Sequence, residues 1–510
     1  MRPVTEKSNG PHGSSAATRV GRNFSFRMGS QVLSALINVA GLALLGNYLH
    51  AQGYGQYAFY YALIPLIGSL GDLGVGIIVT REIARDPGNG RRTFGDAVLI
   101  KSLVSGLILA LAAVTAWLFF PAGPALLICL VAAAALIENS QDPCVWLFRA
   151  YERQDVEALL LTVSQVTWLA GLLIGVWLKL DLTFLIGTAT LAFLVRLAVG
   201  ALMVSRMVYR PSFEPDLGRL RHWVEQGLPF GAAMFGVVLY GRVGVLLLQA
   251  FSTSADVAYF NVAYMLSQPL GFISTALSMS AFPILARYAQ HDPESLRRAL
   301  RKTSKYQMVV TLPATVGLFL LAERIIPLLF HGQDFGKAGL ALKIMSLGLT
   351  LIFINLMARY VLAALDRQQH YLRSIVVGLL VNTVLGLILI PRFGFVGACA
   401  AYVGAELAIF LICQAALRRY VSVADQAREA ARPLLAAAGM GVVLAALSAA
   451  HLLVQIAVGA AVYGALLLAL KGLSPSELRV LRGICGSFRL PRPAAPARAG
   501  NPTGVEGAAI

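Results

Sequence analysis

The sequence predicts an all-α integral membrane protein of about fourteen transmembrane helices, and three observations support this. Of the 510 residues, 57% are hydrophobic and only 13% are charged, about half the charged share of a soluble globular protein. Apolar runs of about 20 residues, each long enough to cross the hydrocarbon core, alternate with short polar breaks. Basic residues concentrate in every second break. These features exclude a soluble enzyme, a disordered chain and a coiled coil.

The predicted spans begin after a polar segment rich in Gly, Ser and basic residues, 1–22. We expect that segment to be a disordered tail. We also expect the basic, Pro- and Ala-rich segment 472–510 to be disordered. The fourteen predicted spans are 23–48, 57–81, 95–120, 124–149, 156–178, 182–206, 227–251, 257–283, 303–323, 338–365, 371–391, 395–418, 432–450 and 453–471.

A weak internal repeat divides these spans into two lobes. Tyr54-Gly-Gln-Tyr57 opens the second span and Asp256-Val-Ala-Tyr259 opens the eighth, and the same offset relates Ile83-Ala-Arg85 to Leu285-Ala-Arg287. We therefore predict pseudo-symmetric six-helix lobes at 23–206 and 227–418, joined by a cytoplasmic linker at 207–226. Two further helices occupy 419–471. Parallel repeats of this kind place a substrate site between the lobes.

The distribution of basic residues predicts the orientation. The net charge is +17, with 42 Lys and Arg. If the N-terminus is cytoplasmic, 33 of these lie in cytoplasmic segments and only Lys179, Arg324, Lys337 and Arg392 lie in outer loops. Positive residues collect on the cytoplasmic side of membrane proteins, so we expect both termini there. This explains most of the excess charge without a nucleic-acid partner.

The sequence contains no motif for binding a metal or a nucleotide. The five cysteines form no CxxC pair and the seven histidines have no ligand spacing. No GxxxxGK[ST] phosphate loop follows a strand. We therefore predict no metal site, no catalytic residues and no cofactor, with proton or sodium coupling left open.

Several stretches resemble the Wzx-type oligosaccharide flippases, the polysaccharide branch of the multidrug/oligosaccharidyl-lipid/polysaccharide (MOP) exporter superfamily. That superfamily includes the MATE multidrug exporters and the lipid II flippases. The resemblance is carried by residues 53–85, 323–349 and 362–410, and above all by IPRFGFVGA between the eleventh and twelfth spans. It implies two six-helix lobes around a central, cationic cavity, plus two C-terminal helices.

The resemblance also implies a function. The protein is expected to move an undecaprenyl-diphosphate-linked oligosaccharide across the bacterial inner membrane by alternating access, for O-antigen, capsule or exopolysaccharide synthesis. Its expected partners are that glycan, membrane lipid, and the polysaccharide polymerase and export machinery. A MATE-type exporter of drugs or other small molecules and a lipid II flippase are the alternatives. A polymerase or glycosyltransferase is disfavoured because the outer loops are short and the first, at His50, carries no acid.

Charges inside spans are costly and are therefore candidates for function. Arg242 lies in the middle of the seventh span, and its guanidinium suits a diphosphate or an acidic sugar. Arg27, Arg81 and Arg359 are further candidates for the cavity, although Arg27 and Arg81 could instead extend to the interface. Arg196 ranks lower, and we expect Lys101 to be an interface lysine.

Four acids lie within spans and are candidates either for ion coupling or for charge balance: Asp72, Glu138, Asp142 and Glu406. Glu138 and Asp142 are four residues apart, hence on one helix face. Two close carboxyls can share a proton. Pro143 should kink this segment, and Gly71-Asp-Leu-Gly74 predicts a bend around Asp72.

Overall fold

The computed structural model describes residues 14–86, 88–119, 122–207, 212, 217–331 and 334–473. Within these ranges the regular secondary structure is entirely helical, which confirms the predicted fold class. The first half contains α1 (Ser14–Leu70), α2 (Val75–Arg85), α3 (Gly90–Phe119), α4 (Ala122–Ser140), α5 (Asp142–Ala150), α6 (Gln154–Trp177) and α7 (Leu182–Met207).

The second half contains seven α-helices and one short 3-10 helix, followed by two α-helices at the C-terminal end. These are α8 (Leu217–Phe251), α9 (Ser254–Ser267), η1 (Gln268–Leu270), α10 (Gly271–His291), α11 (Pro293–Leu329), α12 (Gly336–Ala364), α13 (Gln368–Phe393), α14 (Phe395–Leu417), α15 (Val423–Ala446) and α16 (Leu452–Ala469).

The number of spans agrees with the prediction. Thirteen helices of the described chain are long and apolar enough to cross a membrane, with α1 counted once. Helix α1 has 57 residues, about 85 Å at 1.5 Å per residue, whereas a bilayer core is about 30 Å thick. Its backbone leaves the helical region at His50 (φ 58°, ψ 178°). The kink divides α1 into two spans, which gives fourteen.

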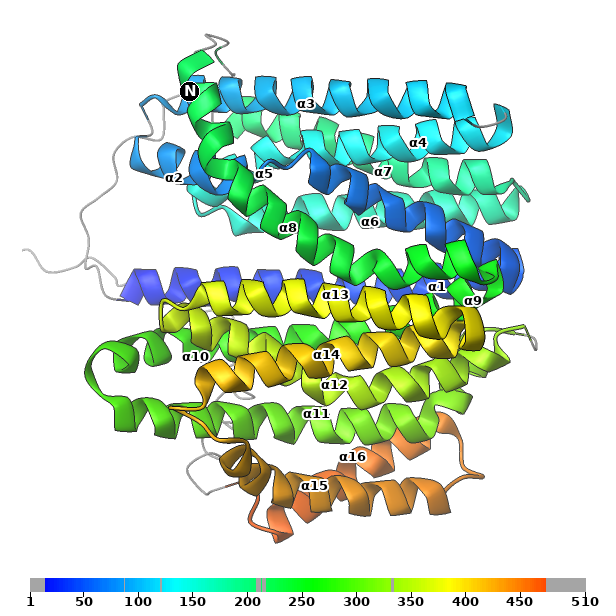
Figure 1. Ribbon diagram of the computed structural model, residues 1–510, viewed down its shortest axis with the longest axis vertical. Coiled ribbons are helices and arrows are strands. Elements are labelled where there is room, and N and C mark those ends of the chain that lie inside the picture. The colour runs from blue at the N-terminus through cyan, green and yellow to red at the C-terminus, as the bar shows by residue number, and fades with distance from the viewer. Residues whose placement is uncertain are drawn as a thin grey trace, which may run out of the picture.

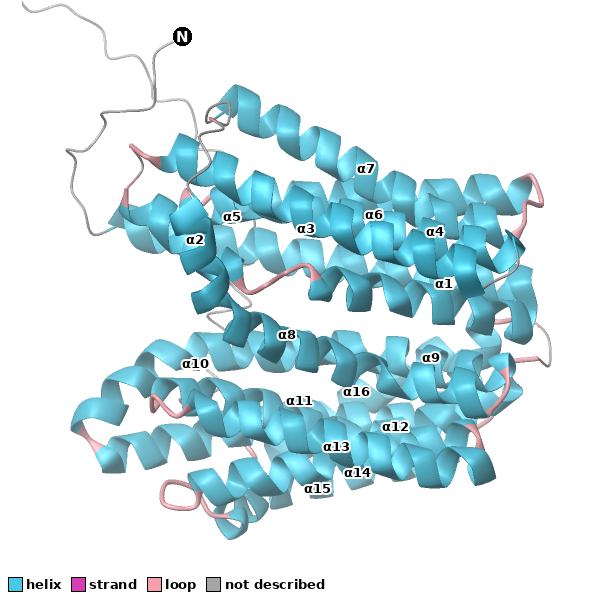
Figure 2. Ribbon diagram, turned by 45° about the horizontal axis from the view of Figure 1, so that its top comes forward, coloured by secondary structure: helices cyan, strands magenta, loops and turns pink. Residues whose placement is uncertain are grey.

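The helices form two bundles that lie side by side (Figures 1 and 2). One bundle contains α1–α7, with α1 on the side that faces the other bundle, and the other contains α9–α14. Helices α15 and α16 pack outside the second bundle against α11. Helix α8 runs from the first bundle to the second, because it packs on α2 as well as on α13. We call the end of the molecule where α2 is followed by α3, α5 by α6 and α12 by α13 the basic end. The opposite end, with His50 and with the ends of α6 and α11, is the neutral end.

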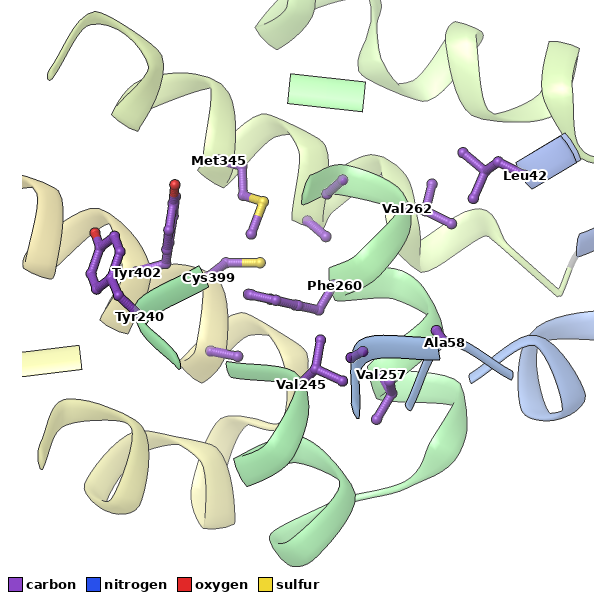
Figure 3. Packing of buried hydrophobic residues seen from close by; sticks show 14 of the residues in the cluster. Leu42, Ala58, Tyr240, Val245, Val257, Phe260, Val262, Met345, Cys399 and Tyr402 are labelled. Carbon is purple, nitrogen blue, oxygen red and sulfur yellow. The ribbon is translucent and has the colours of Figure 1, made fainter. Parts of the chain in front are cut away.

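The largest hydrophobic cluster joins the two bundles (Figure 3). It brings Leu42 and Ala58 of α1 together with Val257 and Phe260 of α9 and continues to Tyr402 of α14. A second cluster holds the basic end of the first bundle and includes Trp223 at the start of α8. The start of α8 is therefore fixed to the first bundle, while the rest of the helix belongs to the second.

Several helices begin well before the predicted spans. Helix α8 begins at Leu217 rather than 227, α11 at Pro293 rather than 303, and α15 at Val423 rather than 432. Hydropathy marks only the segment inside the hydrocarbon, whereas a capped helix continues into the polar layer. Asp292 caps α11 by accepting hydrogen bonds from the backbone of Glu294 and Ser295. Hydrogen bonding to Ser295 holds the pKa of Asp292 below its usual value.

Two spans are interrupted, as predicted. The second span breaks between Leu70 and Val75, and the fourth breaks at Gln141, next to Pro143. Gly74 has a left-handed backbone (φ +67°), and a Cβ there would lie 2.1 Å from the carbonyl oxygen of Gly227 in α8. Only glycine allows both the backbone conformation and this close contact.

We predict that Gly74→Ala destabilises the protein by about 1–3 kcal/mol, because it adds strain and forces α8 away from the break. The thermal midpoint of the detergent-solubilised protein measures this. Gly106→Ala is the matched control, since Gly106 lies in α3 with open space around it. The stability of the control variant should be unchanged or higher by up to about 1 kcal/mol. Equal midpoints for the two variants would contradict the account of the break.

Candidate substrate-binding site

Arg242 lies where the sequence places it, in the middle of α8, and faces a cavity between the bundles. The cavity has a volume of about 50 Å³. Its walls come from α1 (Asn38, Tyr61), α6 (Trp168) and α9 (Asn261). Among the described residues, Arg242 forms no hydrogen bond or ion pair. A cation in this position is available to an anionic ligand.

Aromatic side chains form the first bundle's side of this cavity. Tyr57 and Tyr61 stack with ring centroids 5.6 Å apart. The indole of Trp168 donates a hydrogen bond to the Tyr57 hydroxyl (3.2 Å). Across the cavity, the Asn261 amide donates to the Tyr54 hydroxyl (2.7 Å). The rings are therefore held in fixed orientations, and the last contact links the two bundles.

The bundles are also joined at the neutral end. The Asn47 amide of α1 donates to the carbonyl of Leu329 (2.8 Å), and its oxygen accepts from the backbone of His331 (2.6 Å). His50 and Asp334 form an ion pair at 2.9 Å when the histidine is protonated. Gly46 lies so close to Phe330 that a Cβ would be 2.3 Å from the ring. These contacts close the space between the bundles on this side.

The other predicted basic residues do not gather around Arg242. Arg359 of α12 lines a separate cavity of about 250 Å³ within the second bundle, and its guanidinium lies over the ring of Tyr360. Arg81 of α2 is exposed at the basic end. The side chain of Arg27 lies outside the described residues. Arg196 of α7 lines a third cavity, of about 190 Å³, within the first bundle.

Lys101 is not an interface lysine, and that prediction is wrong. Its side chain is only 3% exposed and lies between Asp72 (3.3 Å) and Asp142 (3.0 Å). Its ammonium also donates to the Gly71 carbonyl (3.2 Å) and to Asn139. Lys101 thus joins the break after α1 to the break between α4 and α5. Asp72 and Asp142 balance its charge.

Glu138 and Asp142 are separated by the helix break and have different surroundings. Asp142 bonds to Lys101, whereas Glu138 lines the third cavity with Arg196. Within the described chain, the Glu138 Oε2 atom has no hydrogen-bond partner. The four-residue spacing predicts that Glu138 and Asp142 lie on one helix face. In the structure these two carboxyls have no common partner.

Glu406 of α14 is buried in the second bundle, at the cavity of Arg359. Its carboxylate accepts hydrogen bonds from the Tyr240 hydroxyl (2.8 Å) and the Asn355 amide (2.8 Å). The Asn355 Oδ1 atom, also buried, has no partner among the described residues. No lysine or arginine of the described chain forms an ion pair with Glu406.

Sequence reasoning missed the uncharged residues of these cavities, notably Asn38, Trp168 and Asn355. These residues carry no charge and so gave no ion-pair signal, and only a polar residue isolated in an apolar run hinted at them. Asn355 is such a residue, in the run Leu351–Met357.

Two models of known protein families match this chain. Residues 20–289 match the model of the polysaccharide biosynthesis proteins, and residues 158–471 match that of the lipid II flippase MurJ. Each match covers more than half of the chain. The chain belongs to the polysaccharide flippases of the MOP superfamily.

Two curated relatives of this chain carry flippase names. The probable low-salt glycan biosynthesis flippase Agl15 of Haloferax volcanii is 22% identical over 374 residues, 73% of this chain and 78% of the relative. The probable lipid II flippase MurJ of Bdellovibrio bacteriovorus is 26% identical over 234 residues, 41% of this chain and 44% of the relative. Both relatives are described as probable flippases.

Solved structures share the fold at low identity. A lipid II flippase MurJ in an inward closed conformation superposes with a TM-score of 0.73 at 14% identity, covering 86% of this chain and 97% of that chain. An inward-facing MATE multidrug transporter of the MOP superfamily superposes with a TM-score of 0.60 at 16% identity, covering 78% and 98%.

We predict that Lys101→Met lowers the stability of the flippase by about 3 kcal/mol, because it leaves two carboxylates without their cation. Fluorescence-detected size exclusion of heated membranes measures this. Adding Asp142→Asn should recover part of the loss. Lys343→Met is the control, because its partner Glu323 is 68% exposed and such pairs contribute at most about 1 kcal/mol. A similar loss for both lysines would contradict the role of Lys101.

Proposed function

We propose that this flippase moves an undecaprenyl-diphosphate-linked oligosaccharide from the inner to the outer leaflet of a bacterial inner membrane by alternating access, for O-antigen, capsule or exopolysaccharide synthesis. The observation that carries the proposal is Arg242, a cation with no hydrogen-bond or ion-pair partner among the described residues, in the cavity between the bundles. A guanidinium binds phosphate oxygens through paired, charge-assisted hydrogen bonds. An anionic lipid head group would pair with the Arg242 guanidinium.

A groove on the second bundle supports a substrate with a lipid tail. It has a volume of about 700 Å³, lies between α10 and α11, and is lined mainly by apolar side chains such as Leu277 and Ile284. Arg298 and Lys302 line the same groove. Apolar walls with adjoining cations suit a polyprenyl chain attached to a phosphate.

The proposed orientation in the membrane rests on the distribution of basic residues. The basic end faces the cytoplasm in this proposal, with both termini on that side. Contacts at the neutral end, such as Asn47 with Leu329, then close the periplasmic side. The substrate enters from the cytoplasmic leaflet. The polysaccharide polymerase and export machinery receive the glycan after release.

Coupling to a proton or sodium gradient is assigned to Glu406. Its carboxylate accepts from two neutral donors, Tyr240 and Asn355, and the Asn355 Oδ1 atom, which has no partner in the described chain, supplies a further oxygen. Carboxylate and amide oxygens suit a hard cation. Asp72 and Asp142 already balance Lys101, which leaves them in a structural role.

The second candidate function is lipid II transport, which the MurJ family match over residues 158–471 favours. Lipid II and oligosaccharide substrates share the polyprenyl diphosphate and differ in the glycan. A MATE-type exporter of cationic drugs is less consistent with a central cavity whose arginine has no partner in the described part of the chain. Deleting the gene and identifying the lipid-linked glycan that accumulates in the inner leaflet separates the candidates.

We predict that Arg242→Ala lowers glycan export roughly ten- to a hundredfold in the complemented deletion strain, as expected for loss of charged hydrogen bonds worth about 1.5–3 kcal/mol. Arg242→Lys should restore export only in part, because an ammonium cannot make the paired contact. Surface glycan and membrane protein level are measured together. Arg221→Ala, an exposed arginine beside Glu225, should export normally. Normal export by the Arg242→Ala variant would refute the assignment.

We predict that Glu406→Gln abolishes the dependence of transport on the proton or sodium gradient, because the amide keeps the shape and removes the charge. Transport into proteoliposomes is measured with each gradient imposed separately. Glu323→Gln, at an exposed acid, is the control and should respond normally. A Glu406→Gln variant that still responds fully to the gradient would remove Glu406 from the coupling mechanism.

A further inference from the structure

A cavity inside the first bundle is separate from the phosphate-binding position at Arg242. We call it the side chamber. It has a volume of about 190 Å³, room for roughly six water molecules at about 30 Å³ each. The polar side chains that line it are Asn38, Tyr61, Glu138, Ser164, Gln165 and Arg196, and Trp168 adds an aromatic ring.

The side chamber adjoins the cavity of Arg242. Asn38, Tyr61 and Trp168 line both spaces, so these residues form the partition between them. A ligand with its anionic group at Arg242 therefore has its next chemical unit beside the side chamber.

Polar atoms in the chamber lack protein partners. Among the described residues, the Glu138 Oε2, Gln165 Oε1 and Arg196 Nε atoms form no hydrogen bond. Two of these are acceptors and one is a donor. Buried polar groups normally have partners, so this set is complementary to a ligand that both donates and accepts hydrogen bonds. A bare metal cation would satisfy the acceptors and repel Arg196.

The aromatic wall is rigid. A Cβ at Gly41 of α1 would lie 2.3 Å from the Trp168 ring, so the ring rests directly on the α1 backbone. The Tyr57 hydroxyl fixes its indole nitrogen (3.2 Å), and Tyr61 lies beside it at 6.3 Å between centroids. A fixed ring offers apolar surface to the C–H face of a cyclic ligand at little cost in side-chain entropy.

We infer that the side chamber binds one sugar ring of the lipid-linked substrate and sets the preference of the flippase for glycan-bearing over sugar-free polyprenyl diphosphate. A pyranose has hydroxyls that both donate and accept, an apolar face for Trp168, and a size that fits the chamber. The inference rests on the proposed function, because it takes the diphosphate to be at Arg242. Glu138 and Gln165 are then specificity residues.

The test compares two lipids on the full-length protein in nanodiscs. The probes are undecaprenyl diphosphate and the lipid-linked glycan extracted from the deletion strain, mixed in equal amounts, with the bound lipid identified by native mass spectrometry. Wild-type protein should hold mostly the glycan-bearing lipid. Gln165→Leu and Glu138→Gln should each lower the ratio of glycan-bearing to bare lipid by about three- to tenfold, consistent with the loss of a hydrogen bond.

Binding of the bare lipid at the wild-type level shows that each variant is folded. Gln249→Leu is the matched control, because Gln249 in α8 also has an unpartnered Oε1 among the described residues but does not line the chamber. Gln165→Met, closer in shape to glutamine, replaces the leucine variant if that one binds no lipid. Wild-type ratios in the chamber variants, or an equal fall in the Gln249→Leu control, overturn the inference. Wild-type protein that binds neither lipid overturns the proposed function as well.

Discussion

The cost of placing a charge inside a bilayer governs this structure. Two charged residues within the spans have different surroundings. Lys101 is surrounded by protein acceptors, and its contacts with Asp72 and Asp142 hold two interrupted helices together. Arg242 is left without a partner among the described residues and lies at a cavity instead. The paired charge therefore stabilises the fold, whereas the unpaired charge is available to a ligand.

This division also bears on how the proposed alternating access would deform the structure. Lys101 and the second hydrophobic cluster fix α2, α3, α5 and the start of α8 as one unit. The remainder of α8 packs on α13 in the other bundle. Any rocking of the bundles must therefore bend α8, and the segment between Gly227 and Arg242 contains Pro229. Arg242 ends this segment, so motion of the bundles would change the surroundings of the proposed substrate-binding position.

The sequence was most informative about the spans and least informative about partners. Runs of apolar residues predicted fourteen spans, and Pro143 and the Gly71–Gly74 segment predicted the two breaks. Hydropathy could not locate the helix starts at Leu217 or Pro293, because those turns lie outside the apolar segments. The burial of Lys101 was missed because its acceptors come from three separate places in the chain, the break after α1, helix α4 and helix α5. The aromatic and amide residues around Arg242, such as Trp168 and Asn261, come from distant parts of the chain, and only packing brings them together.

The central claim is that the space beside Arg242 opens to the cytoplasm and binds an anionic lipid there. It is tested most directly by placing a cysteine at Met265, which lines the same cavity, in a variant without the five native cysteines. A membrane-impermeant maleimide should label this cysteine from the cytoplasmic side and not from the periplasmic side. Undecaprenyl diphosphate should protect it only when Arg242 is present. Labelling from the periplasmic side alone, or equal protection with Arg242→Ala, would contradict the account.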